Sequence, residues 1–282
     1  MAKNQSPLIS VDELNACLTE SNLVILDASI PPVGVMKQPE NCWPNVTIPS
    51  ARRFDINNEF CDPEAIYPHT MPTSELFTEQ ARLLGVNNNS KIVVYDWYGI
   101  FSSARAWWMF KSMGHEHVYV LDGGLPAWLS KGFSTEGRME KTVNKGDFSG
   151  HLKCGYFQNS ESVLAQLADE SSCVLDARAS ARFYGKVEEP RVGVRSGHMP
   201  GAKNLPFTEL LNNGQMKPRA ELEPILQNVV DKTQMLTFSC GSGVTACVLA
   251  LAYTLCEYEN LSVYDGSWSE WGARDDLPVT KA

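Results

Sequence analysis

The stretch FSCGSGVTACVLALAY (238–253) places a thiol, Cys240, between an apolar segment and a long run of small and apolar residues. The two glycines of the loop tolerate unusual backbone angles, so successive N–H groups can turn inward around one point. A helix beginning near Val244 would add its positive end to the same point. Such surroundings favour the thiolate, the nucleophilic form of cysteine, and would stabilise a persulfide formed on it. We therefore expect Cys240 to be a nucleophile; on the loop alone, the alternative is a buried structural cysteine.

Other classes of cysteine enzyme fit this loop poorly or need a partner elsewhere. Cysteine phosphatases hold phosphate with the arginine of a C-x5-R signature, and here Ala246 stands at that position, so phosphoryl transfer would lack its main electrostatic support. A cysteine protease or acyl transferase needs a histidine base. Of the five histidines, His69 in the Pro-rich YPHTMPTSE is the plausible site residue. We expect His198 to make a structural hydrogen bond, and His115 and His117, which follow a helix end, to lie at the surface.

Most segments of the sequence occur twice at a nearly constant offset. KIVVYDWYGIFSSARAWWMF (91–110) parallels QMLTFSCGSGVTACVLALAY (234–253), and VYVLDGGLPAWLSKG (118–132) parallels LSVYDGSWSEWGARD (261–275). This pattern indicates a duplicated domain rather than a solenoid, whose periods are far shorter. Asp96 takes the place of Cys240 in the first copy. Because a carboxylate cannot carry sulfur, we expect the second copy to catalyse and the first to support it.

Each copy alternates β-branched runs with helical patterns, which predicts an α/β fold with a mostly parallel sheet flanked by helices. The helical patterns ELFTEQARLLG and ARAWWMFKSMG end at glycine. In such sheets ligands bind beyond the carboxyl ends of the strands, which is where Cys240 follows its strand. The expected strands are 23–26, 92–95 and 118–121 in the first copy and 174–175, 235–239 and 262–264 in the second.

The polar segment STEGRMEKTVNKGDFSG (134–150) is the natural linker between the copies. We predict a non-catalytic domain at 1–135, a linker at 136–154 and a catalytic domain at 155–282.

Composition argues against several classes of function. The formal net charge is -9 with no basic stripe, so we expect no nucleic-acid binding. The longest apolar run, 244–256, is too short to span a bilayer, so we expect no membrane partner. The eight cysteines form no C-x-x-C pair and no cluster with zinc-ligand spacing, so we expect neither a metal nor another cofactor. The start, MAKNQSPLIS, has no signal or transit character, and scattered thiols suit a reducing compartment; we expect a cytoplasmic or mitochondrial protein.

Over nearly its whole length the sequence resembles the two-domain rhodanese family of sulfurtransferases, and most closely its 3-mercaptopyruvate-using members. The segments that carry the resemblance are CGSGVTA, LDGGLPAW, RAWWMF, EEPRVGVRSGHMPGAKNLP and YDGSWSEWGAR. It implies two tandem rhodanese-like domains. Thiosulfate-using members typically carry CRKGVTA, and here Gly241 and Ser242 replace that Arg and Lys.

This replacement has a physical meaning. Thiosulfate is a dianion and benefits from two cations beside the nucleophile, whereas 3-mercaptopyruvate carries one carboxylate, remote from its sulfur. The resemblance implies that two arginines, Arg182 in SARFYG and Arg191 in EEPRVG, hold the carboxylate and ketone as planar forks. Without the resemblance, both would read as solvated surface arginines. The loop residues expected to contact the donor are Gly241, Gly243, Val244 and Thr245.

The resemblance also implies that Ser242 and His69 assist Cys240. An acidic residue usually joins them shortly after the FD of the first domain, but FDINNEF has Asn57 there, with Asp55 and Glu59 nearby. Asn57 could orient a histidine but could not stabilise its positive form as a carboxylate would. Asn57 therefore weakens the case for a Ser–His–Asp relay in this protein.

The sequence thus predicts a ping-pong sulfurtransferase. Sulfur would pass from 3-mercaptopyruvate to a Cys240 persulfide, with release of pyruvate, and then to a small thiol, a thioredoxin-type protein or cyanide. Two alternatives stay open: a rhodanese that prefers thiosulfate, and a non-catalytic rhodanese module that only binds partners.

Overall fold

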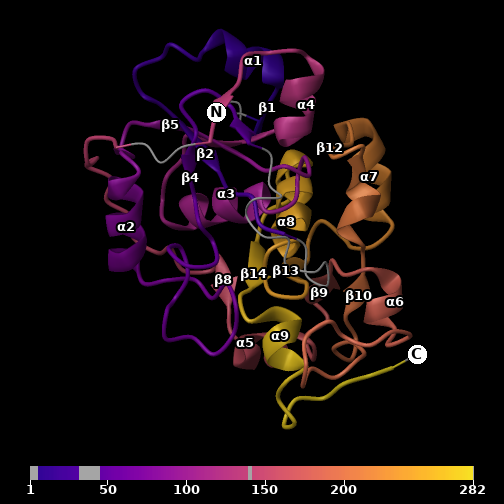
Figure 1. Ribbon diagram of the computed structural model, residues 1–282. Coiled ribbons are helices and arrows are strands. Elements are labelled where there is room, and N and C mark those ends of the chain that lie inside the picture. Colours follow the sequence, from indigo (N-terminus) through magenta and orange to yellow (C-terminus); the bar gives the residue numbers. More distant parts are fainter. Residues whose placement is uncertain (1–5, 32–44, 139–141, 282) are drawn as a thin grey trace. The chain divides into compact units, whose positions relative to one another are not determined.

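The computed structural model describes residues 6–31, 45–138 and 142–281, which form two compact units (Figure 1). Among these residues, the first unit comprises those up to Phe60 together with Pro72–Lys153 and Asn213–Met216. The second comprises Cys61–Met71, Cys154–Asn212 and the residues from Lys217 onward. Each unit therefore contains a segment from the other half of the sequence.

The first unit is built on a five-stranded sheet of order β1-β6-β5-β2-β4, in which all neighbouring strands are parallel. Its three central strands consist almost wholly of buried residues, as expected for a sheet covered on both faces. The predicted strands at 23–26, 92–95 and 118–121 are confirmed. The strands are β1 Leu8–Ile9, β2 Leu23–Asp27, β4 Arg52–Arg53, β5 Lys91–Tyr95 and β6 Val118–Leu121.

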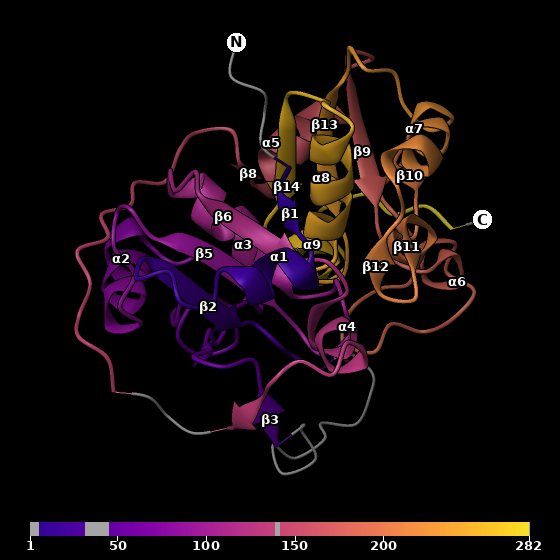
Figure 2. The same ribbon diagram turned by 90° about the horizontal axis from the view of Figure 1, so that it is seen from above.

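Helices lie against this sheet (Figure 2). They pack on it through two apolar clusters. In one cluster, Ile25 of β2 packs with Leu14 of α1 and Trp128 of α4. In the other, the rings of Phe77 in α2 and Phe110 in α3 lie 5.1 Å apart. The predicted helices are confirmed, because α2 and α3 occupy the segments with helical spacing. The helices of this unit are α1 Val11–Ala16, α2 Ser74–Leu83, α3 Ser103–Ser112 and α4 Gly124–Ser130.

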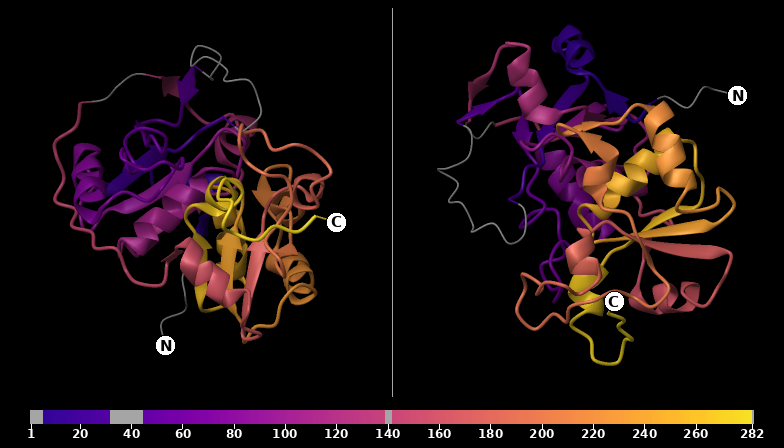
Figure 3. Two further views of the ribbon diagram at one scale, coloured as in Figure 1. Left: turned by 90° about the horizontal axis from the view of Figure 1, so that it is seen from below. Right: turned by 90° about the vertical axis from the view of Figure 1, so that its right-hand side faces the viewer.

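The second unit repeats the architecture with a parallel sheet of order β10-β9-β13-β14-β8 (Figure 3). Helix α8 is buried from Ala246 to Tyr253 because its sequence is apolar all round. Val174 of β9 packs with Trp268 and Trp271 of α9 in a second cluster. The strands are β8 Phe157–Gln158, β9 Ser172–Asp176, β10 Lys203–Asn204, β13 Met235–Ser239 and β14 Leu261–Tyr264. The helices are α5 Ser160–Gln166, α6 Ser180–Phe183, α7 Arg219–Gln227, α8 Ala246–Leu255 and α9 Ser267–Trp271, with a short 3-10 helix at Phe207–Leu210.

The segments exchanged between the two halves of the sequence are held in the same way. In the second unit, the backbone N–H of Met71 donates to Asp265 Oδ2 at 2.7 Å. In the first unit, the N–H of Met216 donates to Asp122 Oδ1 at 2.8 Å. Each aspartate directly follows the last long strand of its sheet, β14 or β6. Equivalent carboxylates therefore anchor equivalent segments in the two copies.

The segment predicted as a linker makes regular contacts with the first unit where it is described. Short strand β7 (Glu136–Gly137) pairs antiparallel with β3 (Val46–Thr47), and the N–H of Phe148 donates to Val86 O at 3.1 Å. The Phe148 side chain is buried. The proposed boundaries at 135 and 155 stay a prediction.

Two further short strands are β11 Leu211–Asn212 and β12 Gln215–Met216. No helix within the described ranges is long and apolar enough to cross a bilayer.

Candidate active site

Cys240 lies immediately beyond the carboxyl end of β13, which runs between β9 and β14 in the middle of the second sheet. Its backbone is fixed from both sides by α9. The N–H of Cys240 donates to Ser267 Oγ at 3.2 Å, and its carbonyl accepts from Trp268 N at 3.0 Å. The next carbonyl, that of Gly241, accepts from Ser269 N at 2.8 Å. The loop is thus held in one conformation before any substrate arrives.

The backbone of the Cys240 loop agrees in part with the predicted arrangement, in which its N–H groups turn inward to bind an anion. Gly243 has a φ of +75°, a left-handed angle that glycine adopts without strain. Gly241 does not use this region, so the expectation of an unusual angle there is wrong. Helix α8 begins at Ala246, slightly later than predicted. Within the described residues no acceptor takes up the N–H of Gly241 or Ser242, and these donors are available to an anion.

Val244 and Thr245 complete the loop and connect it to α8. Val244 is buried, and its carbonyl accepts from Cys247 N at 3.1 Å. Thr245 is the N-cap residue of α8, but its side chain makes no capping hydrogen bond. The positive end of α8 therefore faces the same loop as the available N–H groups.

The first unit shows how such a loop binds an anion. The Asp96 carboxylate, at the position equivalent to Cys240, accepts three backbone N–H bonds, from Tyr98 at 2.9 Å, Phe101 at 2.8 Å and Ser103 at 2.9 Å. Burial nevertheless raises the pKa of Asp96, and these hydrogen bonds oppose the rise. The loop of the first copy is therefore already occupied by its own carboxylate.

Ser242 joins two of the other predicted site residues. Its Oγ lies 2.9 Å from His69 Nδ1 and accepts from Arg191 Nη2 at 3.3 Å, and the residue is only 3% exposed. His69 has a φ of +64°, an uncommon conformation for a non-glycine residue. Because the Asp265 contact to Met71 fixes the chain two residues later, the second unit maintains this strained backbone.

The two predicted arginines have different surroundings. Arg182 forms a bidentate pair with Glu189, through Nε at 3.2 Å and Nη2 at 2.5 Å. Arg191 contacts Ser242 instead, and burial lowers its pKa, with the positive charge of Arg182 acting in the same direction. A Cβ built on Gly241 would lie 3.4 Å from Arg182 Nη2 and 3.6 Å from Arg191 Nη1. Both guanidinium groups therefore lie beside the residue that follows Cys240.

Sequence reasoning missed the buried ion pairs behind Arg182. Arg178, with a side chain 1% exposed, donates to Asp176 from Nε and Nη2, the latter at 2.6 Å, and to Glu189 Oε1 at 3.0 Å. Its guanidinium also stacks on Trp268 at 4.2 Å. Glu189 was visible in the sequence only as part of the charged run EEPR. Nothing local indicated that it would be buried between two arginines.

The thiol of Cys240 differs from three of the other buried thiols. Those of Cys17, Cys173 and Cys247 donate to backbone carbonyls at 3.3, 3.9 and 3.3 Å. Cys240 is equally buried, at 2% exposed, but its thiol makes no hydrogen bond to another described residue. Cys256 is also buried and has no described thiol hydrogen bond, so this feature alone does not distinguish Cys240; its place at the end of β13 beside two arginines does. Of the remaining cysteines, Cys42 lies outside the described residues and Cys154 is exposed.

Of the remaining histidines, His117 is exposed, as predicted, while two others have structural partners. His198 is buried and its Nδ1 lies 3.0 Å from Phe183 O, so its predicted structural hydrogen bond is confirmed. The surface position predicted for His115 is wrong: it is 4% exposed, and its Nε2 lies 2.8 Å from Ser90 O. Burial lowers its pKa. The error arose because the chain after Gly114 turns back under the Phe110 and Phe148 rings.

The turn that contains Asn57 is organised by Asp55. Asp55 Oδ1 accepts from the N–H groups of Asn57 at 2.9 Å and Asn58 at 3.2 Å, and Oδ2 accepts from Asn58 Nδ2 at 2.8 Å. This carboxylate therefore closes its own turn.

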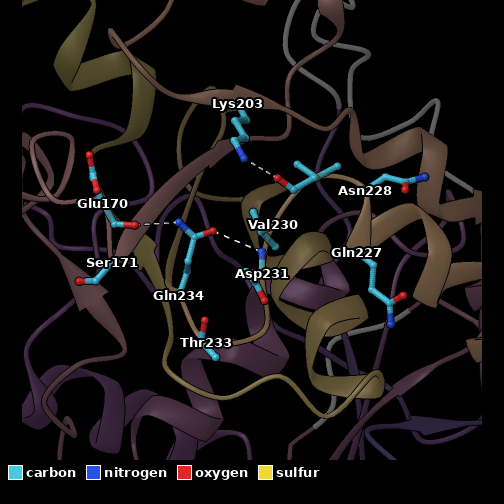
Figure 4. Close-up of a pocket in the computed structure, with 10 residues that line it drawn as sticks. Glu170, Ser171, Lys203, Gln227, Asn228, Val230, Asp231, Thr233 and Gln234 are labelled. Atoms are coloured by element: carbon cyan, nitrogen blue, oxygen red, sulfur yellow. Dashed lines mark hydrogen bonds between the residues drawn. The ribbon is translucent and has the colours of Figure 1, made fainter.

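A hollow of ≈ 650 Å³ lies at the amino-terminal ends of β9 and β13, the end of the second sheet opposite to Cys240 (Figure 4). Its polar groups largely satisfy one another. Lys203 Nζ donates to Val229 O at 2.6 Å, and Gln234 Nε2 donates to Glu170 O at 3.0 Å. No group of three potential metal ligands occurs among the residues that the structure describes.

Comparison with known proteins agrees with this geometry. Residues 10–131 and 160–274 each match the rhodanese-like domain family. The chain is 41% identical over 237 residues to the 3-mercaptopyruvate sulfurtransferase of Escherichia coli, covering 83% of each chain. It is 37% identical to a mitochondrial thiosulfate/3-mercaptopyruvate sulfurtransferase of Arabidopsis thaliana, covering 97% of this chain and 78% of the relative. The crystal structure of SseA from Escherichia coli superposes with a TM-score of 0.85 at 33% identity, covering 94% of this chain and 99% of that one. The chain belongs to the rhodanese family, as a two-domain sulfurtransferase.

Proposed function

We propose that this sulfurtransferase takes sulfur from 3-mercaptopyruvate onto Cys240 and passes it to a thiol, a thioredoxin-type protein or cyanide. The observation that carries the proposal is the rim beside Cys240. It is formed by Gly241 and Ser242, which bear no charge, while Arg182 and Arg191 approach from outside the loop. This arrangement suits a donor whose single carboxylate is separated from its sulfur by a ketone.

In the first half-reaction, the Cys240 thiolate attacks the sulfur of 3-mercaptopyruvate. A new S–S bond forms, the C–S bond breaks, and the electron pair leaves with carbon as the enolate of pyruvate, which then takes up a proton. Arg182 Nη1, which Glu189 does not engage, and Arg191 would hold the donor's oxygen atoms. The loop N–H groups would stabilise negative charge on sulfur.

His69 and Ser242 are the groups positioned to move a proton near Cys240. Because Ser242 Oγ accepts from Arg191, its hydroxyl hydrogen can point toward His69 Nδ1. In this orientation neutral His69 would accept the hydroxyl's hydrogen bond, so the positive charge of Arg191 and the loop N–H groups, rather than the Ser242 hydroxyl, would stabilise negative charge on the departing enolate. In the second half-reaction, an acceptor nucleophile attacks the outer sulfur, takes it, and restores the Cys240 thiolate.

Intact-mass measurement tests the proposal directly. Incubation with 3-mercaptopyruvate should add one sulfur, about 32 Da, and reducing acceptors should remove it. Cys240→Ser should abolish both the mass increment and pyruvate release. Cys154→Ser removes an exposed thiol and is the matched control, which should retain both. Full activity in Cys240→Ser would refute the proposal.

A thiosulfate-preferring enzyme is the second candidate, favoured by the two donors in the name of the Arabidopsis relative. The ratio of kcat/KM for the two donors decides between them. The double variant Gly241→Arg, Ser242→Lys should move the ratio toward thiosulfate, because it adds two cations beside the nucleophile. If no donor adds mass to the native protein, the module is a binding domain.

A further inference from the structure

The charged side chains around the proposed donor site form a series of ion pairs in which most positive charges are offset by carboxylates. Asp176 pairs with Arg178, Arg178 pairs with Glu189, and Glu189 pairs with Arg182. The two carboxylates offset two of the guanidinium groups. Among the described residues, Arg191 has no carboxylate within ion-pair distance, and its hydrogen-bond partner is the Ser242 hydroxyl. The three arginines and two carboxylates therefore carry close to one positive charge in excess, which faces both the donor and the Cys240 thiolate.

Glu189 holds the central place in this balance. Its side chain is only 3% exposed, so water screens its charge poorly. Oε1 accepts from both Arg178 and Arg182, and Oε2 accepts from Arg182 at 2.5 Å. It is also one of the charges that act on Arg191, where it opposes the lowering of the pKa by burial. A single carboxylate thus influences all three arginines.

We propose that Glu189 determines donor specificity by limiting the excess positive charge that the three arginines offer a donor to about one, which matches a monoanionic donor and disfavours a dianion. The inference deepens the proposed function and rests on it. It goes beyond the neutral loop, because it assigns part of the discrimination to a residue that need not touch the donor. Glu189 also orients Arg182, so that only Nη1 is left for the donor.

The test compares kcat/KM for 3-mercaptopyruvate and thiosulfate in four proteins. Glu189→Gln keeps the size of the side chain and one acceptor oxygen but removes the charge. The thiosulfate to 3-mercaptopyruvate ratio should rise by about tenfold, the order expected when one poorly screened charge acts on a donor with one extra negative charge. Glu189→Asp keeps the charge but disturbs the bidentate geometry; both kcat/KM values should fall while their ratio stays near that of the native protein.

Glu188→Gln is the matched control. It makes the same change of net charge one residue away on an exposed side chain, and should leave the ratio unchanged. Added salt should reduce the shift in Glu189→Gln, since the effect is electrostatic. If thermal unfolding shows that Glu189→Gln does not fold, Gly241→Lys adds one positive charge beside the same arginines and should move the ratio the same way.

The outcomes separate the two proposals. If the native protein gains sulfur from neither donor, the proposed function fails. If it gains sulfur but the Glu189→Gln ratio equals that of Glu189→Asp or of the native protein, only the role of Glu189 is overturned. If the replacement variant Gly241→Lys is needed and shows no shift, the charge argument fails as well.

Discussion

Replacing Ser242 by alanine removes the one hydroxyl that joins His69 to Arg191. It would delete a contact of 2.9 Å to an imidazole and one of 3.3 Å from a guanidinium, both at a residue 3% exposed. A neutral hydrogen bond contributes about 1 kcal/mol and one to a charged group about 1.5–3 kcal/mol. The 3.3 Å distance places the charged contact at the lower end, so we expect a loss of about 2–3 kcal/mol of transition-state stabilisation. This corresponds to a decrease of about 30- to 150-fold in kcat/KM.

The assay is single-turnover formation of the persulfide, followed by pyruvate release and by intact mass, so that acceptor steps do not enter. Ser239→Ala is the matched control. Ser239 directly precedes Cys240 and is fully buried, and its hydroxyl has no hydrogen-bond partner among the described residues. It should keep the native rate. A Ser242→Ala rate within threefold of native, or an equal loss in Ser239→Ala, would show that the His69–Ser242–Arg191 contacts do not assist sulfur transfer.

Two further predictions follow from the anchoring aspartates and from the buried histidine. Asp265→Ala should lower the free energy of unfolding by about 1.5–3 kcal/mol, because Met71 loses a charged acceptor, and should also slow persulfide formation, because the His69 segment loses its anchor. Asp122→Ala removes the equivalent contact to Met216 and should cost similar stability without slowing that step; equal slowing in both variants would contradict the assignment. For His115, burial lowers the folded-state pKa below the ordinary 6.5, so the unfolded state binds more protons and stability is lost as the pH falls below about 6.5. Urea unfolding at pH 5 and 7 should show this loss, and His115→Gln should diminish it; an unchanged pH dependence in the variant would assign it to other groups.

The elements that depend on local pattern were predictable. The β-branched runs became the central strands, and the apolar run after the Cys240 loop became the buried helix α8. The loop itself was predictable because its glycines and the start of the following helix can be recognised from consecutive residues in the sequence. Its details were less so: only Gly243 takes the left-handed angle, and Gly241 lies beside two guanidinium groups that come from distant parts of the sequence.

What sequence reasoning missed depends on residues that are distant in the chain. His69 meets Ser242 across 173 positions, and its attachment to the second unit depends on Asp265. The resemblance supplied His69 and Arg182, but not their supports. The sequence singled out neither Glu189 nor Arg178, because burial of an ion pair is decided by the packing around it and not by its neighbours in sequence.

Because segments are exchanged, neither half of this polypeptide contains all the residues of one structural unit. A fragment beginning at residue 155 would retain Cys240, both arginines and Glu189, yet its histidine would be left behind on the other piece. The two copies of the duplicated domain are therefore not independent modules, because each structural unit includes a backbone segment from the other copy. The first copy, whose loop holds the Asp96 carboxylate, therefore still supplies the segment that contains His69.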